Sequence, residues 1–465
     1  MATESKDLIV LGSGPGGYVA AIRAAQLGRS VTIVERDSLG GICLNWGCIP
    51  SKALLRSAQL YHDVHRSEEF GFTTSGITLD FPKVVKRSRD VAGKLSGGVS
   101  YLMKKNKIEV VHGTGKIKKG NLLEVKDKDG KVKTLSYKDI IIATGARARS
   151  IPGVEIDGET IHSYRTLLDY KKLPKKTLVI GGGVIGIEFG YLHSTFGAEV
   201  TIVEMMDQIL PLEDTEVARG LEKIFTKNGM KIYTSTKVKE VKKSGKGVSV
   251  TYENKDGVQT WTGDLVLVSV GVIPNTENIG LEEVGIATDR GYIKVNDKLQ
   301  TNVPNHYAIG DCIPTPQLAH VASHEGIIAA EFASGKGKHH MTYDNVPSCV
   351  YCQPQVASIG LSEKACKEKG IKYKIGNIPF SAIGKAIAIG EAEGFIKVII
   401  DPDVGEVLGV HILHSEATEL ISEAAIIRSH EGVAASVVDT IHPHPTLSES
   451  MMEAMALAMG RPINY

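Results

Sequence analysis

One short pattern occurs twice in this chain of 465 residues, and it constrains the fold more than any other feature. An apolar run at residues 8–11 leads into a glycine-rich turn, a helical pattern and a second apolar run that ends at Glu35. The same order returns from residues 178–180 to Glu204, and the first glycine precedes the acid by 23 residues in both copies. Strand, glycine turn, helix, strand and acid in one register predict a βαβ unit that binds a dinucleotide. We therefore expect an α/β fold with two Rossmann-like dinucleotide-binding domains.

The three glycines of each turn have different physical roles. The first allows the tight turn, the second lets the backbone approach a pyrophosphate, and the third lets the helix pack closely on the strand. The phosphates would lie at the positive N-terminus of the helix, and the acid would accept hydrogen bonds from a ribose diol. The positions are Gly12, Gly14, Gly17 and Glu35 in the first unit, and Gly181, Gly183, Gly186 and Glu204 in the second.

Glu204 also predicts which dinucleotide the second unit binds. A carboxylate repels a 2′-phosphate, and residues 205–207, Met-Met-Asp, supply no arginine to hold one. The second cofactor is therefore expected to be NAD(H) rather than NADP(H). A glycine turn can also serve only to pack a helix on a strand, but two complete units in register make that alternative unfavourable for the pair.

The rest of the chain divides around these units. Leu265–Pro274 reads as one buried strand, residues 305–311 as a short strand, and residues 334–340 as a solvated linker. Residues 346–465 alternate strands and helices without a glycine turn, which predicts a separate α+β domain. The expected parts are an FAD-binding domain at 1–150, an NAD-binding domain at 151–275, a central segment at 276–345 that completes the FAD site, and a dimerisation domain at 346–465.

Charge and composition exclude several classes of protein. The 54 basic and 53 acidic residues leave a formal charge of +1, which gives no electrostatic reason to bind nucleic acid or an anionic membrane. No stretch approaches the roughly 20 apolar residues of a membrane-spanning helix. We expect no signal peptide or transit segment, and the six unevenly spaced cysteines favour the reducing cytoplasm over an oxidising compartment.

Two cysteines directly follow the first unit, in Gly40-Gly41-Ile42-Cys43-Leu44-Asn45-Trp46-Gly47-Cys48-Ile49-Pro50-Ser51-Lys52. Glycine and proline allow the thiols to approach at an irregular helix start, where a helix N-terminus favours a thiolate. The spacing alone favours two inert buried thiols, whereas the position beside a flavin-type turn favours a redox-active pair. Cys349 and Cys352 have no further ligands spaced for zinc, so we expect no metal site there, and two buried thiols on a strand are favoured over a second redox pair.

This cysteine segment resembles the redox-disulfide segment of the pyridine-nucleotide–disulfide oxidoreductases, and the resemblance covers nearly the whole chain. It includes both glycine units, Ala143-Thr144-Gly145, Ala308-Ile309-Gly310-Asp311, Gln317-Leu318-Ala319-His320 and His444-Pro445-Thr446-Leu447-Ser448-Glu449. Within the family, the chain is most similar to the branch that oxidises dihydrolipoamide, the E3 component of 2-oxo acid dehydrogenase complexes. The family commonly has Thr where Ile42 stands and Val where Trp46 stands, and these changes could tune the flavin environment.

The resemblance implies two cofactors on opposite faces of one flavin. The first unit would bind FAD, with Glu35 on the adenosine ribose and Asp311 on the ribityl chain, and the second would bind NAD. Lys52 would pair with Glu188 near the flavin N5. The other positions expected at the cofactor sites are Gly115, Thr144, Gly145, Gln317, Leu318, Ala319, His320, Val238 and Gly271.

The resemblance further implies a Cys43–Cys48 disulfide and a homodimer. His444, hydrogen-bonded to Glu449, would approach the cysteine pair of the other subunit, whereas His442 has no such partner in the motif. His444 would remove a thiol proton from dihydrolipoamide carried on a lipoyl domain, of a 2-oxo acid dehydrogenase complex or the glycine cleavage system. Cys43 would form the mixed disulfide, and Cys48 would pass electrons through FAD to NAD⁺.

Three rival functions remain to be compared with this one. An NADPH-dependent reductase of glutathione or a similar disulfide is disfavoured by Glu204, and by Val184 where such enzymes carry a tyrosine. The related soluble transhydrogenases lack the cysteine pair. A non-catalytic assembly subunit is disfavoured because Cys43, Cys48 and His444 are all retained.

Overall fold

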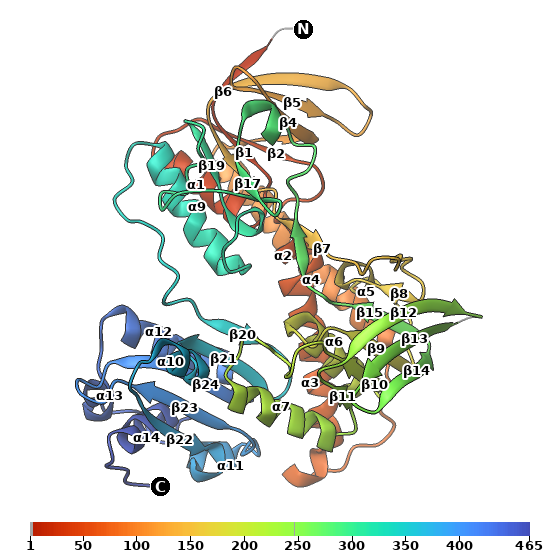
Figure 1. The fold of residues 1–465 in the computed structure, drawn as a ribbon, viewed down its shortest axis with the longest axis vertical. Helices are drawn as coiled ribbons and strands as arrows, with labels where there is room; N and C mark the ends of the chain where they lie inside the picture. The colour runs from red at the N-terminus through yellow and green to blue at the C-terminus, as the bar shows by residue number, and fades with distance from the viewer. Residues whose placement is uncertain (1–2, 246) are drawn as a thin grey trace.

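Three large sheets organise the chain in the computed structural model, which describes residues 3–245 and 247–465 (Figure 1). The first sheet holds the first glycine unit and has the order β3-β2-β1-β6-β5-β4, with β19 paired to β6. Its strands are β1 (Glu4–Leu11), β2 (Val31–Glu35), β3 (Glu109–His112), β4 (Thr114–Lys118), β5 (Leu122–Lys126), β6 (Val132–Ile142) and β19 (His306–Ala308). Its helices are α1 (Pro15–Gln26), α2 (Gly41–Trp46), α3 (Cys48–His65), α4 (Phe81–Lys105) and α9 (Ala319–Ala333).

Helices cover the parallel part of the first sheet, which runs from β3 through β2, β1 and β6 to β19. Leu8, Ile9 and Val10 of β1 are wholly buried, as continuous apolar runs are in parallel strands covered on both faces. Helices α1 and α9 cross so closely that a Cβ at Gly326 would lie 2.5 Å from the carbonyl oxygen of Gly16. The chain therefore returns from residues 306–333 to complete the sheet of residues 4–142.

The second sheet holds the second glycine unit, in the parallel order β11-β10-β9-β15-β8. Its strands are β8 (Ile161–His162), β9 (Lys176–Ile180), β10 (Glu199–Val203), β11 (Lys231–Tyr233) and β15 (Leu265–Val268). An antiparallel sheet of β12 (Lys237–Ser244), β13 (Gly247–Asn254) and β14 (Gly257–Gly263) accompanies it, with helices α5 (Tyr164–Leu167), α6 (Val184–Thr195) and α7 (Thr215–Lys227).

The prediction of one strand over Leu265–Pro274 is wrong. The run divides into β15 and β16 (Val272–Pro274), and β16 pairs with β7 (Ala146–Ala148) instead of with the second sheet. Gly271 lies between them with a φ of 99°, a backbone angle that glycine adopts without strain. The chain thus leaves the second sheet at this glycine and passes back to the first unit.

Short elements connect β16 to β19, the strand with which the chain returns to the first sheet. The C-terminal part that follows is built on a third sheet. The connecting elements are α8 (Leu281–Val284), β17 (Thr288–Asp289) and β18 (Tyr292–Ile293). The third sheet is antiparallel, in the order β20-β21-β24-β23-β22. Its elements are β20 (Ser348–Val350), β21 (Gln355–Gly360), α10 (Glu363–Lys369), β22 (Lys374–Pro379), α11 (Gly384–Ala388), β23 (Phe395–Ile400), β24 (Val407–His414), α12 (Ala417–Ser429), α13 (Ala434–Asp439) and α14 (Glu449–Ala458).

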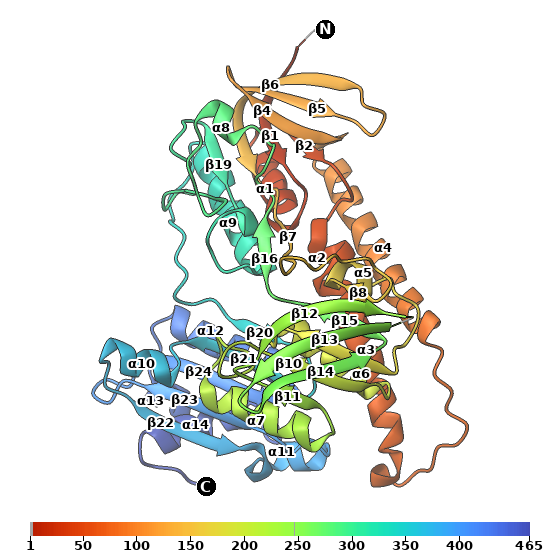
Figure 2. The same cartoon turned by 45° about the vertical axis from the view of Figure 1, so that its right-hand side comes forward.

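The second unit and the C-terminal sheet share a close contact through α7 (Figure 2). A Cβ at Gly220 of α7 would lie 2.8 Å from a methyl carbon of Leu413, so the helix lies directly on β24. Beside it, the buried Lys397 has its Nζ 3.0 Å from Asp214 Oδ1 and 2.9 Å from Glu363 Oε2. Breaking such a buried pair is costly because it leaves a charge without compensation.

Helices α3 and α4 lie side by side and extend from the first unit toward the second, where α3 also contacts α6 (Figures 1 and 2). Helix α3 begins at Cys48, so this arrangement holds the cysteine segment between the two glycine units. Among the described residues, no helix combines the length and the apolar character that crossing a membrane requires.

Candidate functional site

The first glycine turn has the geometry that its sequence predicts. Gly12 has a φ of 106°, and a Cβ there would overlap the carbonyl oxygen of Ala143. A Cβ at Gly17 would overlap the carbonyl oxygen of Gly12, so this glycine allows helix α1 to pack on the turn. A Cβ at Gly14, in contrast, would meet no atom within 4 Å. The space at Gly14 is therefore left for something other than the protein.

The second turn repeats each of these features. Gly181 has a φ of 102°, and its Cβ would lie 2.5 Å from the carbonyl oxygen of Ser269. A Cβ at Gly186 would overlap the carbonyl oxygen of Gly181, whereas a Cβ at Gly183 would meet nothing within 4 Å. Both helices, α1 and α6, thus begin at an open glycine whose backbone a phosphate can approach.

The glutamate that ends the second strand of each unit is hydrogen-bonded to the backbone of its own glycine turn. Glu35 Oε2 accepts hydrogen bonds from the backbone N–H of Ser13, at 2.9 Å, and from its hydroxyl, at 2.6 Å. Glu204 Oε2 accepts from the N–H of Gly182 at 2.6 Å, and its Oε1 accepts from the N–H of Met206 at 2.7 Å. Each residue is only 7–8% exposed, yet Glu35 Oε1, which accepts one bond, and both oxygens of Glu204 keep a lone pair for a ribose hydroxyl.

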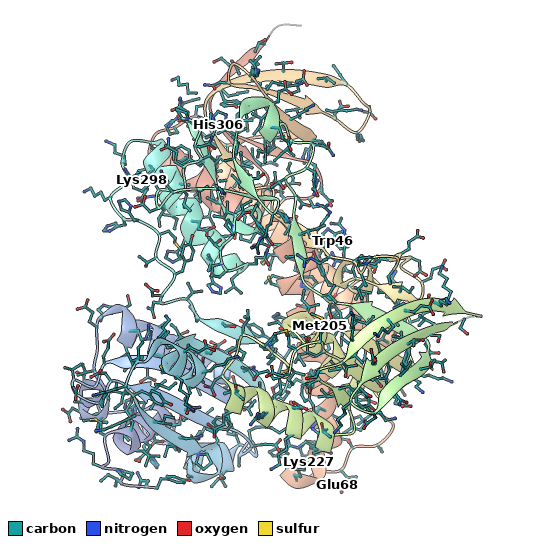
Figure 3. All side chains as sticks on the ribbon, in the orientation of Figure 1. Trp46, Glu68, Met205, Lys227, Lys298 and His306 are labelled. Atoms are coloured by element: carbon teal, nitrogen blue, oxygen red, sulfur yellow. The ribbon has the colours of Figure 1, made fainter. Side chains whose placement is uncertain are left out.

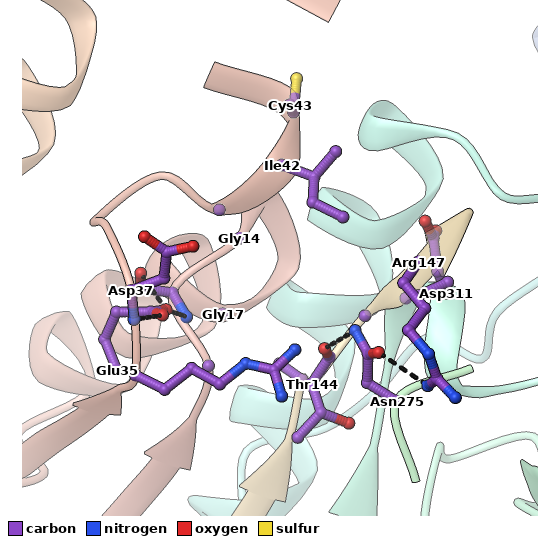
Figure 4. A pocket seen from close by; sticks show the side chains of 18 of the residues that line it. Gly14, Gly17, Glu35, Asp37, Ile42, Cys43, Thr144, Arg147, Asn275 and Asp311 are labelled. Atoms are coloured by element: carbon purple, nitrogen blue, oxygen red, sulfur yellow. Dashed lines mark hydrogen bonds between the residues drawn. The ribbon is translucent and has the colours of Figure 1, made fainter. Parts of the chain in front are cut away.

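A cavity of about 850 Å³ lies beside the first turn and extends to the cysteine segment. Figure 4 shows Glu35 and Asp37 on one side of it, Asp311 on the other, and Gly14 between them, with Cys43 nearby. The predicted site residues that line it are Gly12, Gly14, Gly17, Glu35, Cys43, Cys48, Gly115, Thr144, Gly145, Asp311, Gln317 and Ala319. The cavity therefore brings together residues from the start of the chain and from the returning segment after residue 276.

The polar groups of this cavity fit a bound dinucleotide. The hydroxyl oxygen of Thr144 is buried and has no oxygen or nitrogen hydrogen-bonding partner among the described residues. Burial raises the pKa of Asp311 to about 6, and the nearby charge of Glu325 acts in the same direction. A buried polar group without a partner is unfavourable, so a ligand that supplies hydroxyls here is stabilised. The open backbone at Gly14 and these two side chains together suit FAD.

The two cysteines lie on different helices, Cys43 in α2 and Cys48 at the first residue of α3, with Gly47 between the helices. Both carry free thiols in this structure, and the Cys43 thiol donates a hydrogen bond to Cys48. This bond, with the Lys52 ammonium assisting, lowers the pKa of Cys48 to about 7, whereas the pKa of Cys43 is raised. Cys48 is therefore the thiol that ionises near neutral pH.

Lys52 and Glu188 are brought together from α3 and α6. Lys52 Nζ lies 2.8 Å and 2.9 Å from the two carboxylate oxygens of Glu188. The N–H of Tyr351 donates to Glu188 at 3.1 Å, and the Lys52 ammonium lies 4.4 Å from the centre of the Tyr351 ring. Tyr351 comes from the C-terminal part and carries no local sequence signal for this role. The ion pair thus joins the cysteine helix, the second unit and the C-terminal part.

His444 and Glu449 also lie together, away from the cavity. His444 Nδ1 is 2.9 Å from Glu449 Oε1, and Glu449 Oε2 accepts from the N–H of Thr446 at 2.8 Å. The hydrogen bond with His444 lowers the pKa of Glu449, and the His444 side chain is 78% exposed. No residue after Ala322 is among the described residues that line the cavity. Within one chain the structure therefore does not bring His444 to the cysteines.

His442 has a carboxylate partner that its motif does not reveal. His442 Nε2 lies 2.9 Å from Glu423 Oε1, on α12, and the His442 side chain is only 7% exposed. The partner is 19 residues away along the chain, so the local motif gave no signal for it. Exposure, rather than the presence of a carboxylate, is what separates the two histidines.

The remaining residues that the sequence predicts at the cofactor sites have different surroundings in the fold. Gln317 donates to the hydroxyl of Tyr292 at 3.1 Å, Leu318 precedes the first residue of α9, and His320 Nε2 is 3.0 Å from the carbonyl oxygen of Pro347. Gly271 lies at the turn between β15 and β16. Val238 is partly buried and packs against the apolar cluster around the second sheet.

Two dinucleotide turns, together with a cysteine pair that lines the cavity beside the first of them, define the class of a disulfide oxidoreductase that uses two cofactors. A family model described as pyridine nucleotide-disulphide oxidoreductase matches residues 6–326, and a model of that family's dimerisation domain matches residues 346–455. The chain belongs to this family, and the predicted fold class is confirmed.

Individual members of the family are similar to this chain over nearly its whole length. The dihydrolipoyl dehydrogenase of Zymomonas mobilis is 48% identical over 461 residues, which are 99% of each protein, and that of Bacillus subtilis is 44% identical over the full length of both. Among solved structures, LpdA from Mycobacterium tuberculosis has a TM-score of 0.91 at 29% identity and covers 97% of this chain and 99% of its own. The HOCl-induced flavoprotein disulfide reductase RclA from Escherichia coli has a TM-score of 0.87 at 26% identity, covering 97% of this chain and 99% of its own.

Proposed function

We propose that the chain oxidises protein-bound dihydrolipoamide to lipoamide and reduces NAD⁺, with FAD in the first glycine unit and NAD in the second. The observation that carries this proposal is the place of the cysteine pair. Cys43 and Cys48 line the same cavity as the open backbone at Gly14, and Cys48 has a pKa of about 7. The full-length identity to dihydrolipoyl dehydrogenases supports the choice of substrate.

The cofactor groups have separate partners in this proposal. Gly14, Glu35, Thr144 and Asp311 would hold FAD, and Gly183 with Glu204 would hold NAD. FAD, when bound, supplies the group that accepts two electrons from the dithiol and passes them to NAD⁺ as hydride. The Lys52–Glu188 pair would hold a positive charge beside this group, compensated by the carboxylate.

The residues of the chain carry out the disulfide exchange. His444, oriented by Glu449, would remove a proton from one substrate thiol. The resulting thiolate would bond to Cys43 as the Cys43–Cys48 bond breaks, and Cys48 would leave as a thiolate that its low pKa stabilises. The second substrate thiol, once deprotonated, would displace Cys43, releasing the cyclic disulfide and leaving two reduced cysteines.

A homodimer is part of the proposal, because the exposed His444 lies away from the cysteines of its own chain. The match of residues 346–455 to a dimerisation domain supports it. We infer domain limits at 1–150, 151–275, 276–345 and 346–465, since β19 joins the first sheet and the third sheet begins at β20. The partners would be lipoyl-carrier domains in the cytoplasm.

Initial rates with matched substrate pairs test the proposal. The purified, FAD-containing protein is assayed for NAD⁺ and NADP⁺ reduction with dihydrolipoamide, and for NADPH oxidation with oxidised glutathione. We expect turnover with dihydrolipoamide and NAD⁺ to exceed the others by orders of magnitude. Faster turnover with NADPH and glutathione would instead favour the glutathione-reductase alternative.

A further inference from the structure

Trp46 is the last residue of α2 and stands between the two cysteines, immediately before the Gly47 break. Figure 3 labels Trp46 among the side chains. Two guanidinium groups from other helices lie over its indole. The Cζ of Arg89, on α4, is 4.4 Å from the ring centre, and the Cζ of Arg165, on α5, is 4.7 Å from it. Guanidinium groups over an indole face are attracted by its quadrupole. Trp46 therefore ties the cysteine segment to two other helices.

Arg89 relies in part on this indole for compensation of its charge. Its Nη1 is buried without a hydrogen-bonding partner among the described residues, and burial lowers its pKa, while the charge of Asp169 acts in the opposite direction. A half-buried cation whose Nη1 has no acceptor is stabilised further by the face of Trp46. The position of the indole is consequently set by charge as well as by packing.

Arg165 continues the connection toward the far end of the cavity. Its Nη2 lies 2.6 Å from Asp37 Oδ2, and the backbone N–H of Asp37 donates to Glu35 Oε1 at 2.7 Å. Trp46, Arg165, Asp37 and Glu35 all line the same cavity. An unbroken series of contacts thus runs from the carboxylate of Glu35 to Trp46, two residues before Cys48.

We propose that Trp46 is a positioning residue that couples occupation of the ribose end of the cavity to the geometry of Cys48. A ribose diol on Glu35 would hold the turn at residues 35–37, and Asp37 would then hold Arg165 over the indole. The indole would hold the end of α2 and with it the start of α3, where the helix N-terminus favours the Cys48 thiolate. The inference rests on the proposed function, because it requires an adenosine nucleotide in the first unit.

Adenosine diphosphate tests the coupling because it can fill the ribose and phosphate positions without reaching the cysteines. The full-length protein is freed of flavin and reduced, and Cys48 is alkylated with iodoacetamide at pH 6, with and without the nucleotide. Peptide mass spectrometry reads Cys48 separately from Cys43. We expect the nucleotide to raise the Cys48 rate about fivefold or more, the lower end of the usual coupling between two sites.

The variants separate coupling from simple packing. Trp46→Leu and Arg165→Gln should bind the nucleotide and lose the acceleration, whereas Trp46→Phe keeps an aromatic face and should restore much of it. Arg165 is largely exposed, so its variant keeps the test valid if Trp46→Leu does not fold. Trp261→Phe is the matched control, because Trp261 also lies under a cation, Lys176 at 5.9 Å, but in the second unit.

The chain has only two tryptophans, so the Trp261→Phe protein also reports Trp46 emission directly. Its fluorescence should shift when the nucleotide binds. The inference would be overturned if the acceleration persisted in both Trp46→Leu and Arg165→Gln, or if the nucleotide bound with no effect on the Cys48 rate. Either result would leave the proposed function standing. Failure of the unmodified, flavin-free protein to bind the nucleotide would count against the FAD assignment itself.

Discussion

The hydrogen bond between the two cysteines sets the pH at which Cys48 ionises, and replacing Cys43 tests this. In Cys43→Ala the largest cause of the low pKa, the Cys43 donor, is lost, so we expect the pKa of Cys48 to rise from about 7 to near its ordinary value of 9.0. That change corresponds to about 2.7 kcal/mol. At pH 7 the thiolate fraction should fall from about one half to about one hundredth, because a higher pKa favours the neutral thiol.

Cys43→Ser is the matched control, since its hydroxyl still donates a hydrogen bond. The rate of Cys48 alkylation is measured from pH 5 to 10 in both reduced variants. We expect the Ser variant to titrate near 7 and the Ala variant near 9, with alkylation at pH 7 roughly fiftyfold slower in the Ala variant. Titration of both variants near 7 would refute the role of the hydrogen bond, and would leave Lys52 as the main cause of the low pKa.

Four further predictions concern the cofactors, the base and the dimer. Glu204→Ala should weaken NAD⁺ binding by about 1–3 kcal/mol in a direct titration, and equal turnover of NAD⁺ and NADP⁺ by the unmodified protein would contradict the assignment. Gly14→Ala should leave the thermal unfolding of the flavin-free protein nearly unchanged, because the added Cβ meets no atom within 4 Å at an ordinary φ of −61°, yet weaken flavin retention. His444→Ala should lower dihydrolipoamide oxidation by about 10² to 10⁴ but spare NADH oxidation by an artificial acceptor, with a smaller loss for Glu449→Gln. Heterodimers of Cys43→Ser with His444→Ala should regain activity, and no recovery would place the base within its own chain.

The features that could be predicted from the sequence are those whose signal is local. Each glycine unit is complete within some 25 residues, so its spacing predicts the roles of Gly14 and Gly17, whereas the contact of Gly12 with Ala143 comes from a distant strand. The resemblance located Lys52 and Glu188, and the structure pairs their charged groups at 2.8 Å.

What escaped prediction depends on contacts between distant segments. The run from Leu265 to Pro274 reads as one strand, and only pairing with β7 shows that it serves two sheets. The Glu423 partner of His442 and the arginines over Trp46 come from other helices, which no local pattern identifies. Long-range electrostatic partners of this kind are set by tertiary packing rather than by local propensity.

Glu204 would meet the ribose of NAD and also accepts a hydrogen bond from its own turn, and this limits how cofactor preference can be engineered in this protein. The carboxylate that would meet the ribose already accepts the N–H groups of Gly182 and Met206. Its replacement by arginine would bring a cation toward a 2′-phosphate, but would also leave these two donors without acceptors, at about 1–3 kcal/mol each where water is excluded. A redesign for NADP⁺ therefore has to rebuild the backbone after β10 so that other acceptors satisfy both donors before the charge is changed.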